Sequence, residues 1–317
     1  MPLSRRDLMA GFLAAPAILR ATTGYAKAPL AAAPVPSIYR VKVGDIEVTA
    51  VHDGMFRLPA NLFFADTATV QQVAAAASYP DPMPIPIMTF LVNTGDKLAL
   101  IDGGFGKAGG PISGRLVQHL AAAGVTPADI DVVLLTHAHP DHIAGLVGDQ
   151  GKPLFPNAEL IAAETERKFW FDDGFMSQAP AEAKALFQFA RDGFAPYAAR
   201  TTLIGDGKEV LPGIRAEAAP GHTPGHTMFR ISSGSSQLLV FGDIVHSAVL
   251  QFPHPEWSLA FDSDPTQARI TRARVLDMVS ADKLVFAGAH VPFPSIGTVV
   301  KQGSGYAYAP TIWRVDL

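Results

Sequence analysis

Residues 136–142 read Thr136-His137-Ala138-His139-Pro140-Asp141-His142, which places three imidazoles and a carboxylate within six residues. The apolar run before them, Asp131-Val132-Val133-Leu134-Leu135, predicts a buried strand, so these side chains lie on the loop at its carboxyl end. His137 and His139 are two residues apart and can point the same way from an extended segment. Asp141 and His142 follow the Pro140 turn and can aim at a second ion. The pattern therefore predicts a site for two metal ions.

Three further candidate ligands follow at long spacing, each at or just beyond a β-like apolar run. They are His222 in Gly221-His222-Thr223-Pro224-Gly225-His226, Asp243 in Phe241-Gly242-Asp243, and His290 in Ala287-Gly288-Ala289-His290. Neutral imidazole and carboxylate suit Zn²⁺, Mn²⁺, Fe²⁺ and Co²⁺. The sequence has no cysteine, so thiolate ligands are excluded, and we expect two divalent ions with zinc as the first choice.

In these four segments the chain resembles the metallo-β-lactamase superfamily, whose signature is His-x-His-x-Asp-His followed by distant His, Asp and His. All seven positions match. The resemblance implies that the first ion is held by His137, His139 and His222, the second by Asp141, His142 and His290, and that Asp243 bridges both. The alternative of ordinary loop histidines is disfavoured, because four segments match in order. The resemblance also implies an αββα sandwich of two stacked mixed β-sheets flanked by helices, with the ligands on loops at one edge.

The periodicity of the chain predicts elements in an order that fits this sandwich. Strands are predicted at 37–43, 45–52, 88–93, 97–102, 131–135, 210–217, 227–232, 237–241 and 283–286, the final strand; helices are predicted at 114–123, 180–198 and 265–279, with a further helix start at Thr126-Pro127. The chain has 317 residues, 48% of them apolar, and no repeat or low-complexity linker divides it. We therefore predict a single metallo-hydrolase domain over residues 35–317.

The first 28 residues resemble a twin-arginine export signal. Ser4-Arg5-Arg6-Asp7-Leu8-Met9 precedes the apolar run at 10–19, which is too short to span a bilayer. Ala26-Lys27-Ala28 offers a cleavage site, and Ala31-Ala32-Ala33 is a competing one. The prediction is a signal peptide over residues 1–28 and a periplasmic or secreted protein. A basic tail on a cytosolic enzyme is the alternative.

The charge of the chain bears on its partners. The net charge is −4 and the sequence pI about 6.2, and beyond the signal the densest basic cluster is Arg269, Arg272 and Arg274. These values predict no nucleic-acid partner. The resemblance implies a small-molecule ester or lactone as the substrate. We also expect no stable membrane insertion, and the resemblance implies a homodimer.

Other residues near these segments receive supporting roles. Asp102 ends a strand and resembles the superfamily aspartate that orients a ligand histidine by hydrogen bonding, and His226 is predicted to support the ligands rather than to bind an ion. His119 is expected on the surface of its helix. His246 follows Asp243 by three residues and is predicted to contact the substrate, with an ordinary packed histidine as the alternative.

Two ions that share a hydroxide would supply a nucleophile at neutral pH, which attacks an acyl or phosphoryl centre. Asp243 and Asp141 are the predicted catalytic carboxylates. Antibiotic hydrolysis is disfavoured, because true β-lactamases generally carry cysteine or serine where the second ion's ligand would come. A glyoxalase II is disfavoured as well, because the region after residue 280 holds few basic groups for glutathione.

Closer still, the chain resembles the methyl parathion hydrolase group and its lactonase relatives. The matching stretches are 221–227, Val249-Leu250-Gln251-Phe252, Phe261-Asp262-Ser263-Asp264 and 289–297. That group has an aromatic pocket over its metals, which Trp170, Phe187 and Phe261 are expected to form. Acyl-homoserine lactonases have a tyrosine where this chain has His246, so a flat aryl lactone or ester is the preferred substrate. Phosphotriester hydrolysis is expected as a secondary activity and is also an alternative main activity. Acyl-homoserine lactone hydrolysis is a second alternative. The third alternative is an exported metal-binding protein without catalytic activity.

Overall fold

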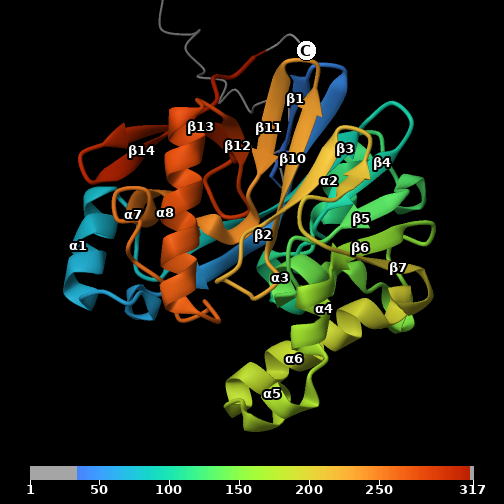
Figure 1. Ribbon diagram of the computed structural model, residues 1–317, viewed down its shortest axis with the longest axis horizontal. Coiled ribbons are helices and arrows are strands. Elements are labelled where there is room, and N and C mark those ends of the chain that lie inside the picture. The colour runs from blue at the N-terminus through green and yellow to red at the C-terminus, as the bar shows by residue number, and fades with distance from the viewer. Residues whose placement is uncertain (1–33, 315–317) are drawn as a thin grey trace, which may run out of the picture. The chain divides into compact units, whose positions relative to one another are not determined.

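The computed structural model describes residues 34–314, apart from the side chain of Glu182, so the predicted signal peptide lies outside the described residues. Within the described residues, the chain from Pro36 onward forms one compact unit. In this unit two seven-stranded sheets are stacked, and helices cover their outer faces (Figure 1). The predicted αββα sandwich is confirmed.

In each sheet the strands lie side by side in the order of the sequence. The first has the order β1-β2-β3-β4-β5-β6-β7, with β1 (Ile38–Val43), β2 (Ile46–Leu58), β3 (Met83–Asn93), β4 (Leu98–Ile101), β5 (Val132–Leu134), β6 (Glu159–Ala163) and β7 (Thr201–Ile204). The second has the order β14-β13-β12-β11-β10-β9-β8, with β8 (Glu209–Leu211), β9 (Ile214–Ala218), β10 (Thr227–Ser233), β11 (Ser236–Val240), β12 (Val285–Ala287), β13 (Ile296–Gln302) and β14 (Gly305–Pro310). Strands β4 to β7 pair in parallel, as do β11 and β12, and the remaining pairs are antiparallel.

The core lies between the two sheets and beneath the helices. Alternate side chains of one strand point into these two apolar layers. In β5, Val132 and Leu134 join the cluster between the sheets, whereas Val133 packs under the helices. A strand that is buried on both faces has no polar side to show, which explains why this segment reads as an unbroken apolar run. The ligand loop at residues 136–142 therefore leaves a rigid strand.

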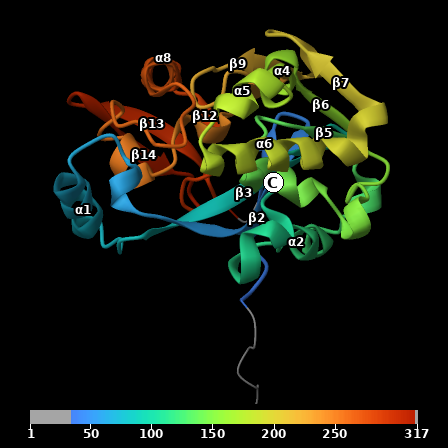
Figure 2. The ribbon, with the colours of Figure 1, turned by 90° about the horizontal axis from the view of Figure 1, so that it is seen from below.

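Eight α-helices are present in the described part of the chain: α1 (Thr67–Ala76), α2 (Leu116–Ala122), α3 (Pro140–Ile143), α4 (Glu164–Trp170), α5 (Asp173–Gln178), α6 (Ala181–Phe194), α7 (Ala248–Gln251) and α8 (Pro265–Ala281). α2, α4 and α6 contribute apolar side chains to the layer outside the first sheet, and α8 contributes to the layer outside the second. Figure 2 shows α2 and α8 on opposite sides of the strands. Among the described residues, no helix has the length and hydropathy needed to cross a bilayer.

Several predictions about local structure were wrong. The segment 210–217 is two strands that turn at Gly213, whose φ of 80° favours glycine. β12 is not the final strand, because β13 and β14 follow it, and the start at Thr126-Pro127 gives only the 3₁₀ turn Pro127–Asp129. His119 was expected on the surface, but α2 packs against β2 and the residue is only 5% exposed. There Nδ1 of His119 donates a hydrogen bond to the His52 carbonyl, 2.6 Å away.

Candidate metal centre

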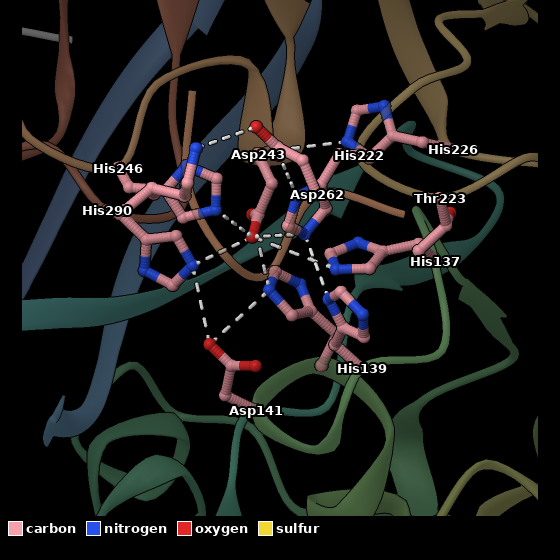
Figure 3. A network of polar contacts seen from close by, with 12 residues as sticks. His137, His139, Asp141, His222, Thr223, His226, Asp243, His246, Asp262 and His290 are labelled. Atoms are coloured by element: carbon pink, nitrogen blue, oxygen red, sulfur yellow. Dashed lines mark hydrogen bonds and ion pairs between the residues drawn. The ribbon is translucent and has the colours of Figure 1, made fainter. Parts of the chain in front are cut away.

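The candidate ligands come from four loops that meet at one edge of the stacked sheets (Figure 3). His137 to His142 follow β5 and open α3, His222 precedes β10, Asp243 follows β11, and His290 follows β12. Six of the seven residues are buried, and Asp141 is only partly exposed. The structure thus brings together all the residues that the spacing predicted as ligands.

Asp243 lies at the middle of this cluster. Its Oδ2 atom is 3.2 Å from Nε2 of His222 and 3.1 Å from Nε2 of His290. Its Oδ1 atom is 3.2 Å from Nε2 of His142. One carboxylate therefore faces imidazoles from both predicted ion groups, which is the placement that a bridging ligand requires.

The other six residues form two groups around that carboxylate. The ligand atoms of His137, His139 and His222 lie within 4.8 Å of one another, and the same holds for Asp141, His142 and His290. In the first group, Nδ1 of His139 faces Nε2 of His222 at 2.9 Å. These two groups match the two ion sets that the family resemblance implied.

The donor atoms fit divalent ions. Nε2 of His137, Nε2 of His142 and Oδ1 of Asp243 are buried and make no hydrogen bond within the described part of the chain. Buried polar atoms without a partner are costly, and imidazole nitrogen with carboxylate oxygen is a donor set that Zn²⁺ takes. The site can therefore hold two divalent ions, and the chemistry of its donors explains the unpaired atoms.

Electrostatics within the cluster follow from burial and from the carboxylates. Burial and the neighbouring imidazoles hold the pKa of His137 and His139 well below the ordinary value, so both rings are neutral and can offer a lone pair to an ion. Burial also acts against protonation of His222, but hydrogen bonds to Asp243 and Asp262 raise its pKa to about 9. The imidazoles around Asp243 hold the pKa of its carboxyl well below the usual range in spite of burial. Ions that bind here would take the place of protons on the imidazoles near the carboxylates.

Asp102 orients the ligand loop, as the resemblance implied. Its Oδ2 atom accepts hydrogen bonds from Nδ1 of His142 and from the Thr136 hydroxyl, both at 2.8 Å, and Oδ1 accepts from the Thr136 amide, also at 2.8 Å. Because Nδ1 of His142 donates in this contact, Nε2 is the atom that faces Asp243 and would offer its lone pair to an ion.

His226 supports the position of Asp243 and has no free donor atom for an ion. Its Nδ1 donates to the Ala219 carbonyl at 3.2 Å, and its Nε2 accepts the backbone amide of Asp243 at 3.0 Å. Burial lowers the pKa of His226 to about 3, so the ring stays neutral and keeps this tautomer. The geometry agrees with the supporting role that was predicted for it.

Two buried residues behind His222 were missed, of which Asp262 contacts it directly and Arg272 contacts Asp262. Asp262 accepts a hydrogen bond from Nδ1 of His222 at 2.8 Å, and Arg272 lies 3.6 Å from its other oxygen. Burial acts to raise the pKa of Asp262, but His222 and Arg272 lower it below the ordinary value. Asp262 lies in the matching stretch 261–264. Arg272 belongs to the basic cluster that the sequence shows, and the structure buries it.

Glu166 was missed as well, because a glutamate in a short polar helix gives no sign of burial. Its carboxylate is buried between the loop of His137 and the loop of His222 and accepts four hydrogen bonds there. Burial raises its pKa above the ordinary value, while the four donors act against that shift.

A pocket of about 200 Å³ opens above the cluster. It is lined by His139, Asp141, His222, Asp243, His246 and His290 on the polar side and by Phe56, Phe105, Pro140, Leu186 and Phe261 on the apolar side. His246 and Phe261, which were predicted for the substrate pocket, both line this cavity. Phe56 and Phe105 were missed, because they come from β2 and from the loop after β4, far along the chain from the ligand motif.

A larger pocket of about 960 Å³ adjoins the first and shares His139, Leu186 and Phe261 with it. Trp170 and Phe187 line this second pocket and not the one over the cluster, so the aromatic wall that was predicted is divided between two neighbouring cavities. Trp170 still approaches the site, since its ring lies edge-on to His139 with centroids 5.6 Å apart.

Comparison with known proteins agrees with this geometry. Residues 83–290 match the family model described as the Metallo-beta-lactamase superfamily, and the chain belongs to that superfamily. The crystal structure of AbOPH, a hydrolase in the beta lactamase superfamily, is 31% identical with a TM-score of 0.84, over 89% of this chain and 100% of that one.

A lactonase structure is similar to nearly the same extent. The dizinc quorum-quenching lactonase AidC is 28% identical with a TM-score of 0.83, over 88% of this chain and 99% of that one. A curated relative from Mus musculus, Metallo-beta-lactamase domain-containing protein 1, is 27% identical over 198 residues, which are 61% of this chain and 62% of the relative. The chain thus spans less than two thirds of the mouse protein's length. The class of protein is therefore the metallo-beta-lactamase superfamily, in which the two similar structures are a hydrolase and a dizinc lactonase.

Proposed function

We propose that the protein is a binuclear metal-dependent hydrolase of lactones and aryl esters, with secondary activity on phosphotriesters. The observation that carries this proposal is the pocket of about 200 Å³, which has the candidate ligands on one side and aromatic rings on the other. Of the described residues that line it, none is lysine or arginine. A pocket with this lining favours a neutral, flat substrate over an anionic one.

Two divalent ions, of which zinc is the first candidate, would supply water activated for attack at neutral pH and an electrophile for the substrate oxygen. His137, His139 and His222 would hold one ion, and Asp141, His142 and His290 the other. Asp243 would join the two groups, and Asp102 and His226 hold the ligand loops in place. Phe56, Phe105 and Phe261 exclude water and stack on the flat part of the substrate.

A second candidate is an acyl-homoserine lactonase, which the pocket of about 960 Å³ favours. This cavity adjoins the candidate centre and is lined by Phe169, Phe175 and Phe187 among other apolar residues, so it could take an acyl chain. AidC, the similar dizinc lactonase, supports this alternative. A phosphotriesterase as the main activity is the third candidate, and the neutral pocket is compatible with it.

A hydrolysis panel on the zinc-loaded protein tests the proposal. We expect an aryl lactone to be hydrolysed with a higher kcat/KM than an acyl-homoserine lactone, a phosphotriester, a β-lactam or a glutathione thioester. Elemental analysis should find about two ions per chain, and Asp243→Ala should lower this content and abolish hydrolysis. Asp192→Ala, which removes an exposed carboxylate from α6, serves as the control.

The outcomes separate the alternatives. Preferred turnover of an acyl-homoserine lactone or of the phosphotriester would replace the aryl lactone as the main substrate. Two bound ions without turnover of any ester would support an exported metal-binding protein. A content near one ion, with full activity in Asp243→Ala, would contradict the binuclear site.

A further inference from the structure

Glu166 is a buried carboxylate with an unusual set of partners. It lies on α4 and is 1% exposed. Its Oε1 atom accepts hydrogen bonds from the Ala138 amide at 2.8 Å and from Nε1 of Trp170 at 2.6 Å. Its Oε2 atom accepts from the Thr223 hydroxyl at 2.6 Å and from the Gly225 amide at 3.1 Å. Each oxygen therefore has two donors.

Three of the four donors, those of Ala138, Thr223 and Gly225, belong to the segments that carry the first group of candidate ligands. Ala138 stands between His137 and His139, and Thr223 follows His222 directly. Among the described residues, none of the hydrogen-bond partners of Glu166 carries a positive charge. A buried charge without a counter-ion is destabilising unless hydrogen bonds compensate it, so the position of the two loops and the charge of Glu166 depend on each other.

The packing leaves little freedom at this junction. A Cβ atom at Gly225 would lie 2.2 Å from the amide nitrogen of Glu166, so the second loop lies directly against the start of α4. Only glycine allows this approach. The loop cannot move away without breaking the Gly225 and Thr223 hydrogen bonds, and it cannot move closer.

We propose that Glu166 is a positioning residue that sets the spacing between the His137–His139 loop and His222, and hence the affinity of the first ion. The inference rests on the proposed binuclear centre. Trp170 donates to the same oxygen as Ala138 and lines the larger pocket. Glu166 therefore also fixes the position of one wall of that pocket relative to the candidate ligands.

Two pairs of variants test this role. Glu166→Gln keeps the size of the side chain but turns one oxygen into an NH₂ group, which then faces two donors in either orientation. Its control is Glu164→Gln, which removes an exposed carboxylate from the same helix. Thr223→Val removes one donor without changing the size, and Thr223→Ser keeps the hydroxyl group.

The measurement is a zinc titration of the metal-free full-length protein against a chromophoric chelator, which resolves two dissociation constants. Glu166→Gln should weaken one constant by roughly 10- to 100-fold and change the other by less than about threefold. The weakened constant should be the one that His139→Ala abolishes, and His290→Ala should abolish the other. Thr223→Val should weaken the same constant by a smaller factor, whereas Thr223→Ser and Glu164→Gln should leave both unchanged.

Equal weakening of both constants with a lower thermal midpoint would show that Glu166 only stabilises the fold. Unchanged constants in either Glu166→Gln or Thr223→Val would also overturn the proposal. If Glu166→Gln does not fold, Thr223→Val still decides the question. Absence of ester turnover in the wild-type protein would contradict the proposed function alone, because the zinc constants do not depend on activity.

Discussion

Nδ1 of His222 donates a hydrogen bond to Oδ1 of Asp262, which lies 2.8 Å away at the buried side of the candidate centre. The other oxygen of Asp262 accepts the Leu259 amide at 3.0 Å and faces Arg272. The imidazole is thereby fixed in the orientation in which Nε2 points at Asp243. A carboxylate behind a ligand histidine also makes that histidine a stronger donor to a metal.

Asp262→Asn should weaken zinc binding, because an amide cannot accept from both the His222 ring and the Leu259 amide. We expect the affinity for one of the two ions to fall by roughly 10- to 100-fold, with a parallel loss of kcat. Competition titration with a chelator measures the affinity. The control is Asp264→Asn, two residues along the same segment, where the side chain is exposed and asparagine can still cap α8. Equal losses in both variants would show that Asp262 has no specific role.

Arg272→Met should lower the free energy of unfolding by about 3–5 kcal/mol, the range typical of breaking a buried ion pair on one side. The guanidinium is buried, donates to the carbonyls of Ile244, Pro255 and Trp257, and faces Asp262. Urea unfolding at neutral pH gives the value.

The control is Arg269→Met, on the exposed side of the same helix, which should change the free energy of unfolding by less than about 0.5 kcal/mol. The double variant with Asp262→Asn should lose less than the sum of the two single losses, because the remaining charge is removed as well. Additive losses would show that Arg272 acts through its carbonyl contacts alone.

The sequence was sufficient for the candidate ligands, because their residue types are rare and their spacing is tied to strand ends. The His-x-His-x-Asp-His run follows β5 as predicted, and the sandwich followed from the family resemblance. Glu166 and Arg272 could not be recognised, since a charged residue in a helix normally faces solvent and only the tertiary packing shows otherwise. The same limit applies to Phe56 and Phe105, whose rings reach the pocket from strands and loops that periodicity cannot place in space.

Export remains a prediction of the sequence, because residues 1–28 lie outside the described part of the structure. Protein recovered outside the cytoplasm should lack these residues, and Arg5→Lys with Arg6→Lys should retain the precursor in the cytoplasm. Mass spectrometry of the N-terminus tests the cleavage. Arg20→Lys, beyond the apolar run of the signal, is the matched control and should not affect export. An intact Met1 on exported protein would contradict a cleaved signal.

His246 is the pocket residue that we expect to select among substrates. It is buried, lines the pocket over the cluster, and its Nε2 lies 3.1 Å from Oδ2 of Asp243. Burial lowers its pKa to about 4, so the ring is neutral at pH 7 and offers one N–H donor. The backbone amide of His246 donates to the Gln251 side chain at 2.7 Å, which holds the residue in place whatever its side chain is.

His246→Leu should therefore keep both ions and shift the substrate preference. A polar ring favours an ester carbonyl, whereas leucine favours the alkoxy groups of a phosphotriester. We expect kcat/KM for an aryl lactone to fall and that for a phosphotriester to fall less or to rise, a change in preference of about tenfold, or about 1.4 kcal/mol. The control is His254→Leu, because the His254 ring stacks on Trp257 away from the pocket. This variant should leave the substrate preference unchanged. Equal losses on both substrates, or loss of an ion, would make His246 a structural residue, and the preference for aryl lactones would then lose its support.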